Sequence, residues 1–220
     1  MSKGQLEKNF RAYEDAIKGT HDEAFIGYAL KANHNMHVLR HLAGMGCGAV
    51  LVSGNELLTA IKAGFNKRKM VFNGNGKTIE EIKLAVENGI MINIDSEFDL
   101  EHILFAAMET KKKAKCLLRI NPDVDPKVHP YVSTGMASSK FGFESQKLKY
   151  FCEIIKQNPD KIQLVGVHSH IGSTIKDVQV FKDAATKMVE YVEQIRAEGF
   201  KLEWLNLGGG LGIDYERKGE

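Results

Sequence analysis

The sequence predicts an α/β fold in which strands and helices alternate along the chain. Short apolar, β-branched runs recur through the 220 residues, and segments with helical spacing stand between them. Strands joined through helices run parallel, because a parallel pair needs a long crossover connection. A chain of this kind forms either a β/α barrel or an open doubly wound sheet, and periodicity alone leaves both alternatives open.

Seven runs have the length and composition of strands. They are Phe25–Leu30, Ala49–Val52, Met70–Phe72, Ile90–Ile94, Cys116–Ile120, Leu164–Val167 and Leu202–Leu207. A closed β/α barrel needs eight strands in about 250 residues. The sequence therefore resembles an incomplete eight-stranded barrel, with residues 1–220 forming one partial domain.

Helices are predicted where apolar residues recur at spacings of three and four. These segments are Gln5–Ile17, Glu56–Ala63, Ile79–Val86, Glu97–Glu109 and Val178–Glu198. Ser53 precedes the second of them and is expected to cap its N-terminus. From Asn121 to Ser145 the sequence has neither the helical nor the strand periodicity, which predicts a long functional loop. We expect residues 123–140 of this loop to act as a lid.

Composition excludes several classes of protein. The 30 Lys and Arg residues nearly balance the 28 Asp and Glu residues, so a basic nucleic-acid arm is not expected. Apolar runs are far shorter than the roughly 20 residues that cross a bilayer, and the polar start resembles neither a signal nor a transit peptide. A cytoplasmic protein is therefore expected. Its cysteines lack metal-site spacing and predict buried free thiols: Cys47, Cys116 and Cys152.

Reactive side chains follow two of the predicted strands, at the edge where β/α folds keep their sites. Lys31 follows the first; in an apolar pocket its amine would become a nucleophile able to form a Schiff base, and a solvated lysine is the alternative. His168 and His170 follow the sixth strand. They suit either a metal pair or a ring stacked on an aromatic cofactor, with Ser173 donating to a phosphate.

Three consecutive glycines, Gly208, Gly209 and Gly210, follow the seventh predicted strand. Without a Cβ, their backbone N–H groups can approach a phosphate, although a turn without a ligand is the alternative. A dinucleotide motif would need glycine where Ile213 stands.

Six motifs, taken in order, resemble the diaminopimelate decarboxylases, which are fold-type III pyridoxal-phosphate enzymes with an alanine-racemase-like barrel. The motifs are Tyr28–Asn33, Arg119–Val124, His129–Tyr131 with Thr134–Gly135, Ser139–Gly142, His168–Ser173 and Gly208–Gly210. The resemblance runs from about Ser2 to the C-terminus. The stretch from Arg119 to Gly142 is more typical of this family than of ornithine or arginine decarboxylases.

The resemblance implies that Lys31 carries pyridoxal 5′-phosphate through a Schiff base and that His170 stacks on its ring. Ser173 and the backbone of Gly208–Gly210 are implied to hold the phosphate, and no metal is implied. The implied reaction converts meso-diaminopimelate to L-lysine and CO₂, the last step of lysine biosynthesis. Family members place the active site between two subunits, which implies a homodimer when the enzyme is complete.

The family's pattern continues past Glu220 with a Glu-Pro-Gly-Arg motif, a Cys-Glu-Ser motif and a C-terminal β-domain. The chain is therefore expected to be a fragment that is a weak catalyst alone, and a plant-type parent would work in a plastid. Three other functions stay open. They are a non-catalytic partner of a full-length decarboxylase, an ornithine- or arginine-type decarboxylase, and a metal-dependent hydrolase that uses His168 and His170.

Overall fold

A computed structural model describes residues 2–19, 23–124 and 142–213. The chain divides into two compact units, residues 1–73 and 74–220, and each is described by itself. The lid expected at residues 123–140 lies outside the described residues except for Asp123 and Val124.

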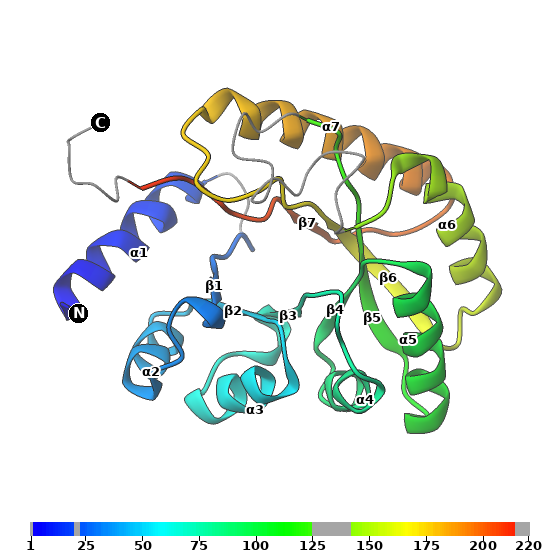
Figure 1. Ribbon diagram of the computed structural model, residues 1–220, viewed down its shortest axis with the longest axis horizontal. Coiled ribbons are helices and arrows are strands. Elements are labelled where there is room, and N and C mark those ends of the chain that lie inside the picture. Colours follow the sequence, from blue (N-terminus) through cyan, green and yellow to red (C-terminus); the bar gives the residue numbers. More distant parts are fainter. Residues whose placement is uncertain (1, 20–22, 125–141, 214–220) are drawn as a thin grey trace. The chain divides into compact units, whose positions relative to one another are not determined.

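The first unit contains three short parallel strands, and β2 pairs with both β1 and β3. Its elements are α1 (Lys3–Ile17), β1 (Gly27–Ala29), η1 (Leu30–Ala32), α2 (Met36–Gly44), β2 (Gly48–Leu51), α3 (Gly54–Ala63), η2 (Lys67–Lys69) and β3 (Met70–Phe72), as Figure 1 shows. Leu39 of α2, Leu57 of α3 and Met70 of β3 are fully buried. The strands therefore share a core with the two helices that connect them.

Helix α3 begins where the sequence predicts it. The Ser53 hydroxyl accepts a hydrogen bond from the Glu56 backbone N–H at 3.2 Å, and Gly64 ends the helix in the left-handed conformation. The predicted N-cap is confirmed, and it satisfies one of the backbone donors that a helix start leaves without a partner.

Replacing this cap is expected to destabilise the first unit. Ser53→Ala should lower the free energy of unfolding by about 1 kcal/mol, because the Glu56 N–H loses its acceptor. The measurement is the urea midpoint by circular dichroism. Thr59→Ala in the same helix is the control, since the Thr59 hydroxyl donates back to the Asn55 carbonyl within the helix and caps no helix end. Equal losses in the two variants would contradict the capping role.

The second unit contains four parallel strands in sequence order, β4 to β7. Its elements are α4 (Ile79–Glu87), β4 (Met91–Ile94), α5 (Glu97–Thr110), β5 (Ala114–Arg119), η4 (Ser145–Lys147), α6 (Leu148–Gln157), β6 (Ile162–His168), α7 (Val178–Ala197) and β7 (Trp204–Asn206). Helices α4 and α5 pack on each other and on β4, while α6 and α7 pack on β6.

Strands β4, β5 and β6 are buried along nearly their whole length, which explains why they read as continuous apolar runs. Glycine is required at one point of close approach: a Cβ at Gly166 would lie 2.2 Å from the Trp204 carbonyl oxygen. This absence of a side chain lets β7 lie against β6.

Two helices in the described residues are not among the predicted segments, α2 and α6. Helix α2 buries two apolar side chains, Leu39 and Leu42, so its helical pattern is weak. Helix α6 buries Leu148, Phe151, Cys152 and Ile155 at spacings of three and four, so this helix is missed although the sequence carries its pattern. The seven predicted strands are all present among the described residues, with ends shifted by up to two residues.

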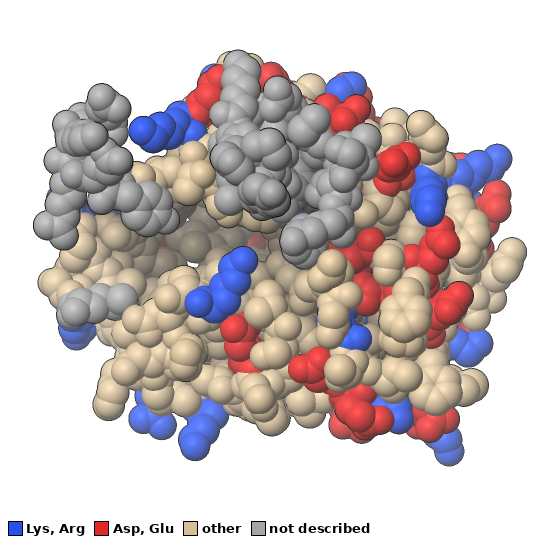
Figure 2. Space-filling model, in the orientation of Figure 1, with Lys and Arg blue, Asp and Glu red and all other residues tan. Residues whose placement is uncertain are grey.

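Other expectations concern burial and charge. Cys47, Cys116 and Cys152 are free and buried, as predicted. On the face drawn in Figure 2, acidic and basic side chains lie interspersed, in keeping with the near balance of charge. Among the helices of the described ranges, none has both the length and the apolar character needed to span a membrane.

Candidate cofactor-binding site

The C-terminal ends of β5, β6 and β7 lie level in the second unit. The register pairs Arg119 with His168 and His168 with Asn206. The hydrogen-bond ladder then continues past the strands, because Ile120 N donates to the His168 carbonyl and Ser169 N donates to the Asn206 carbonyl, both at 2.9 Å. The loops that leave β6 and β7 therefore begin side by side.

The glycine loop, Gly208–Gly210, has a shape that only glycine permits at two of its positions. Gly208 and Gly210 have φ values of 71° and 109°, in the region that side chains disfavour. A Cβ at Gly208 would lie 2.4 Å from the Ser169 carbonyl oxygen, and one at Gly210 would lie 1.8 Å from the Gly172 carbonyl oxygen. The loop is thus pressed against the segment that follows β6.

Hydrogen bonds fix this contact between the two loops. Gly209 N donates to His170 Nδ1 at 3.4 Å, Ile175 N donates to the Gly210 carbonyl at 2.9 Å, and Gly212 N donates to the Ile175 carbonyl at 2.8 Å. Ser173 is exposed beside this contact. The structure therefore brings together the predicted residues of the second unit: His170, Ser173 and the glycine loop.

A phosphate fits the composition of this place. Gly208–Gly210 offer backbone without side chains, and the exposed Ser173 adds a hydroxyl donor. The neighbouring Thr174 has a φ of 61°, which is unfavourable for a β-branched residue by about 1–3 kcal/mol. Strain of this kind occurs where a loop is shaped for a ligand rather than for its own stability.

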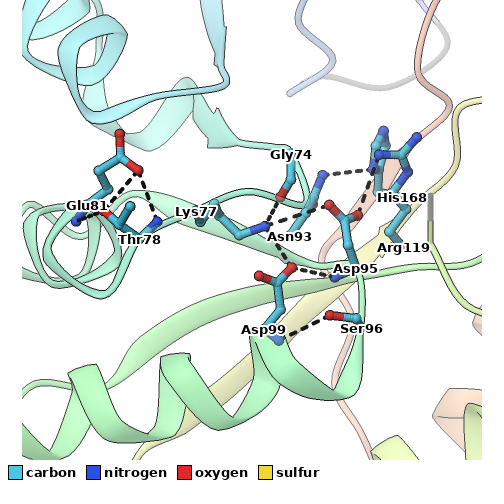
Figure 3. Close-up of polar contacts among 10 residues, drawn as sticks. All are labelled: Gly74, Lys77, Thr78, Glu81, Asn93, Asp95, Ser96, Asp99, Arg119 and His168. Carbon is cyan, nitrogen blue, oxygen red and sulfur yellow. Dashed lines mark hydrogen bonds and ion pairs between the residues drawn. The ribbon is translucent and has the colours of Figure 1, made fainter. Parts of the chain in front are cut away.

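Four buried charged residues, which we call the charge cluster, lie around the carboxyl ends of β4 and β5 (Figure 3). They are Lys77, Asp95, Asp99 and Arg119. Lys77 Nζ lies 2.8 Å from Asp99 Oδ2 and 3.6 Å from Asp95 Oδ2, and it donates to the Gly74 carbonyl. Arg119 Nη1 lies 3.5 Å from Asp95 Oδ1. Two cations thus balance two anions away from water, the condition under which buried charges are tolerated.

Burial and charge act against each other in the charge cluster. Burial raises the pKa of Asp95, while the neighbouring Lys77 and Arg119 cations oppose that rise. Burial likewise lowers the pKa of Arg119, and Asp95 opposes that change. Each group therefore depends on its partner to remain charged.

His168 is buried and uncharged beside this cluster. Asn93 Nδ2 donates to His168 Nδ1 at 2.7 Å, which places the ring proton on Nε2. Burial lowers the pKa of His168 well below its usual range, and the Arg119 cation acts in the same direction. His168 thus serves as a buried hydrogen-bond acceptor in the part of the chain that is described.

A metal site at the two histidines finds no support in the contacts. His168 Nδ1 already accepts from Asn93. Within the described ranges, no group of three or more His, Cys, Asp or Glu side chains could hold a metal ion.

The sequence analysis does not predict the charge cluster. The sequence shows Asp95 as a carboxylate at a strand end, but it gives no indication that Asp95 pairs with Lys77. The sequence feature that could have indicated a buried polar cluster is a polar residue within or at the end of a buried apolar run, as Asn93 is in β4 and Arg119 is in β5.

Lys31 belongs to the first unit. It lies on η1, directly after β1, as the sequence predicts, and its side chain is exposed. The neighbouring Leu30 is fully buried and anchors the turn, and the Tyr28 hydroxyl donates to the Asn33 carbonyl at 3.3 Å. The turn is therefore held while the lysine side chain extends into solvent.

Within each unit, parallel strands pair in sequence order without the reversal of a doubly wound sheet, and polar groups gather at their carboxyl ends, which is typical of the β/α-barrel class. Residues 3–220 match the family described as "Pyridoxal-dependent decarboxylase, pyridoxal binding domain". The chain belongs to this family, and the incomplete β/α barrel predicted from the sequence is confirmed.

Similar proteins include diaminopimelate decarboxylases from several organisms. A rice protein named probable diaminopimelate decarboxylase, chloroplastic, is 58% identical over 97% of this chain, and the Aquifex aeolicus diaminopimelate decarboxylase is 40% identical over 96% of it. These matches cover 43% and 49% of the two relatives. The chain therefore spans about half the length of the curated relatives it matches.

Solved structures give the same relationship. The Helicobacter pylori diaminopimelate decarboxylase complexed with L-lysine has a TM-score of 0.90 at 35% identity, covering 98% of this chain and 54% of that one. The arginine decarboxylase of Paramecium bursaria Chlorella virus has a TM-score of 0.78 at 25% identity, covering 96% and 54%. The shared architecture thus extends to a decarboxylase named for another amino acid.

Proposed function

We propose that this chain is the cofactor-anchoring part of a pyridoxal 5′-phosphate-dependent decarboxylase that converts meso-diaminopimelate to L-lysine and CO₂. The observation that carries the proposal is the 58% identity to the rice protein over 97% of this chain. The glycine loop supports it, because a phosphate can approach backbone that carries no Cβ, and the exposed Ser173 beside it adds a hydroxyl donor.

The residues of this chain have separate roles in the proposal. Lys31 Nζ would hold the cofactor's aldehyde, His170 would pack on its ring, and Ser173 with the glycine loop would bind its phosphate. When bound, pyridoxal phosphate supplies an electron sink for the electrons left by the departing CO₂. The exposed Lys31 side chain can reach a ligand, while the buried Leu30 fixes its backbone.

Covalent trapping tests the cofactor role. Incubation with pyridoxal phosphate, reduction with borohydride and peptide mass spectrometry should place the label on Lys31, and Lys31→Ala should remove that label. Lys62→Ala is the control, because Lys62 lies in the last turn of α3, outside the proposed site. Labelling spread evenly over surface lysines would reject the proposal.

Substrate choice is tested by CO₂ release. We expect release from carboxyl-labelled meso-diaminopimelate above that from ornithine or arginine, because the curated diaminopimelate decarboxylases are 36–58% identical to this chain and the viral arginine decarboxylase is 25% identical, although one solved diaminopimelate decarboxylase matches at only 27%. The rate is expected to be low, since the chain spans about half of its relatives. Preferential release from arginine or ornithine would assign the chain to the other substrate class.

We also propose that the complete enzyme is a homodimer. We further propose that it is located in the compartment where lysine is synthesised. The name of the rice relative, which includes chloroplastic, supports a plastid for a plant protein. Gel filtration of the complete enzyme and microscopy of a tagged chain would test these two points.

A further inference from the structure

The turn that carries Lys31 is short and is held at both ends. On its N-terminal side, Tyr28 in β1 pairs with Ala49 in β2. On its C-terminal side, Asn33 Oδ1 accepts from Asn35 N at 2.9 Å, and Asn35 Oδ1 accepts from His37 N at 3.0 Å as the N-cap of α2. Lys31 therefore lies between the β1–β2 ladder and the start of a helix.

The turn itself has weak internal support. It is a three-residue 3₁₀ helix, a geometry with poor hydrogen bonds, and the preceding Ala29 makes no side-chain cap. Leu30 anchors one side of the turn by complete burial. The Tyr28 hydroxyl bridges the turn by donating to the Asn33 carbonyl at 3.3 Å, so one side chain ties its start to its end.

We propose that Tyr28 is a positioning residue for Lys31, acting through the hydrogen bond from its hydroxyl to the Asn33 carbonyl. This inference rests on the proposed function, in which Lys31 holds the cofactor. The tie fixes the direction in which the Lys31 side chain leaves the backbone. A nucleophile whose backbone is held reaches its reaction geometry more often than one on a loose turn.

The Tyr28 hydroxyl is suited to remain a donor. The ring is partly buried, and this burial raises the pKa of Tyr28. The neighbouring Cys47 raises it further, by a smaller amount. Cys47 in turn donates its thiol to the Ile26 carbonyl at 3.1 Å, and burial raises the pKa of this thiol to about 11. The tie therefore persists at neutral and mildly alkaline pH.

The test is Tyr28→Phe, which removes only the hydroxyl. Tyr13→Phe is the matched control, because Tyr13 is an exposed residue of α1 in the same unit. The readout is the rate of borohydride-trapped attachment of pyridoxal phosphate at Lys31, divided by the rate at the exposed Lys62. We expect Tyr28→Phe to lower this ratio about 10-fold or more, and Tyr13→Phe to leave it unchanged.

Thermal unfolding separates positioning from general stability. Tyr28→Phe should unfold within about 5 °C of the wild type, so the folded population at 25 °C is unaltered while the attachment rate falls. A ratio within twofold of the wild type overturns the inference and leaves the proposed function standing. Absence of labelling at Lys31 in the wild type overturns the proposed function, and the inference with it.

A second variant covers the case in which Tyr28→Phe does not fold. Tyr28→difluorotyrosine keeps the hydroxyl but makes it more acidic. The hydroxyl therefore loses its proton, and with it the hydrogen bond to the Asn33 carbonyl, at a lower pH than in the wild type. The attachment ratio at Lys31 should then fall with pH relative to the wild type. Parallel pH profiles for the two proteins would also overturn the inference.

Discussion

Lys77→Met is expected to destabilise the second unit by about 3–5 kcal/mol, the cost of removing one partner from a buried ion pair. Lys77 Nζ lies 2.8 Å from Asp99 Oδ2 and 3.6 Å from Asp95 Oδ2, and its side chain is fully buried. Methionine fills a similar volume but leaves two carboxylates with Arg119 as their remaining cation in the cluster. The measurement is the urea midpoint at pH 7.

Lys147→Met is the matched control for this variant. Lys147 Nζ also lies 2.8 Å from a carboxylate oxygen, that of Glu97, but both side chains are exposed to solvent. Because water screens such a pair, its removal should leave the urea midpoint unchanged. Similar losses in the two variants would show that burial of the charge cluster is not the cause.

The loss in Lys77→Met should depend on pH. Lys77 is the main cation that opposes the burial-induced rise in the pKa of Asp95, so the pKa of Asp95 should rise further in the variant. A carboxyl whose pKa is higher in the folded than in the unfolded state binds its proton more tightly when folded, so stability increases as pH falls. The deficit should therefore be largest at neutral pH and shrink towards acid; a constant deficit would contradict this account.

Gly210→Ala is expected to weaken pyridoxal phosphate binding about 10-fold or more, if the glycine loop holds the phosphate as proposed. The added Cβ would lie 1.8 Å from the Gly172 carbonyl oxygen, and the backbone φ of 109° costs a side chain about 1–3 kcal/mol. The loop must therefore move away from the Ser169–Ser173 segment. The measurement is the dissociation constant for pyridoxal phosphate by absorbance titration.

Gly76→Ala is the control for the glycine loop. A Cβ at Gly76 meets nothing within 4 Å, and the residue lies outside the proposed binding site. It should bind pyridoxal phosphate as the wild type does, with an unchanged circular dichroism spectrum. Unaltered affinity in Gly210→Ala, with the fold retained, would remove the glycine loop from the phosphate site.

The positions of the strands along the chain could be predicted because buried strands are made of consecutive apolar residues. Strands such as β4 and β5 are enclosed by neighbours, so each reads as an apolar run. The glycine loop could be predicted because three glycines in a row have few structural uses. Helix α2 could not, since its only buried side chains are Leu39 and Leu42, whereas the four buried side chains of α6 give a helical pattern that the sequence does carry.

The charge cluster could not be predicted from the sequence, because its members come from separate loops and strand ends. Lys77 precedes α4, Asp95 follows β4, and Arg119 ends β5. Arg119 and Asp95 are each visible at the end of an apolar run, but nothing in the sequence pairs them with Lys77 or Asp99. Only the level register of the strands, which sets Arg119 beside His168, brings such groups to the same buried place.

The charge cluster also constrains how this chain can change over evolutionary time. Replacing one member leaves an unmatched charge in the interior, whereas exchanging a cation and its anion together for apolar residues of similar volume can be nearly neutral. Substitutions at Lys77 and Asp99 should therefore be strongly epistatic: each deleterious alone, and tolerated as a pair. A lineage can leave this arrangement only by a coordinated step, so the four positions are expected to be inherited as a block.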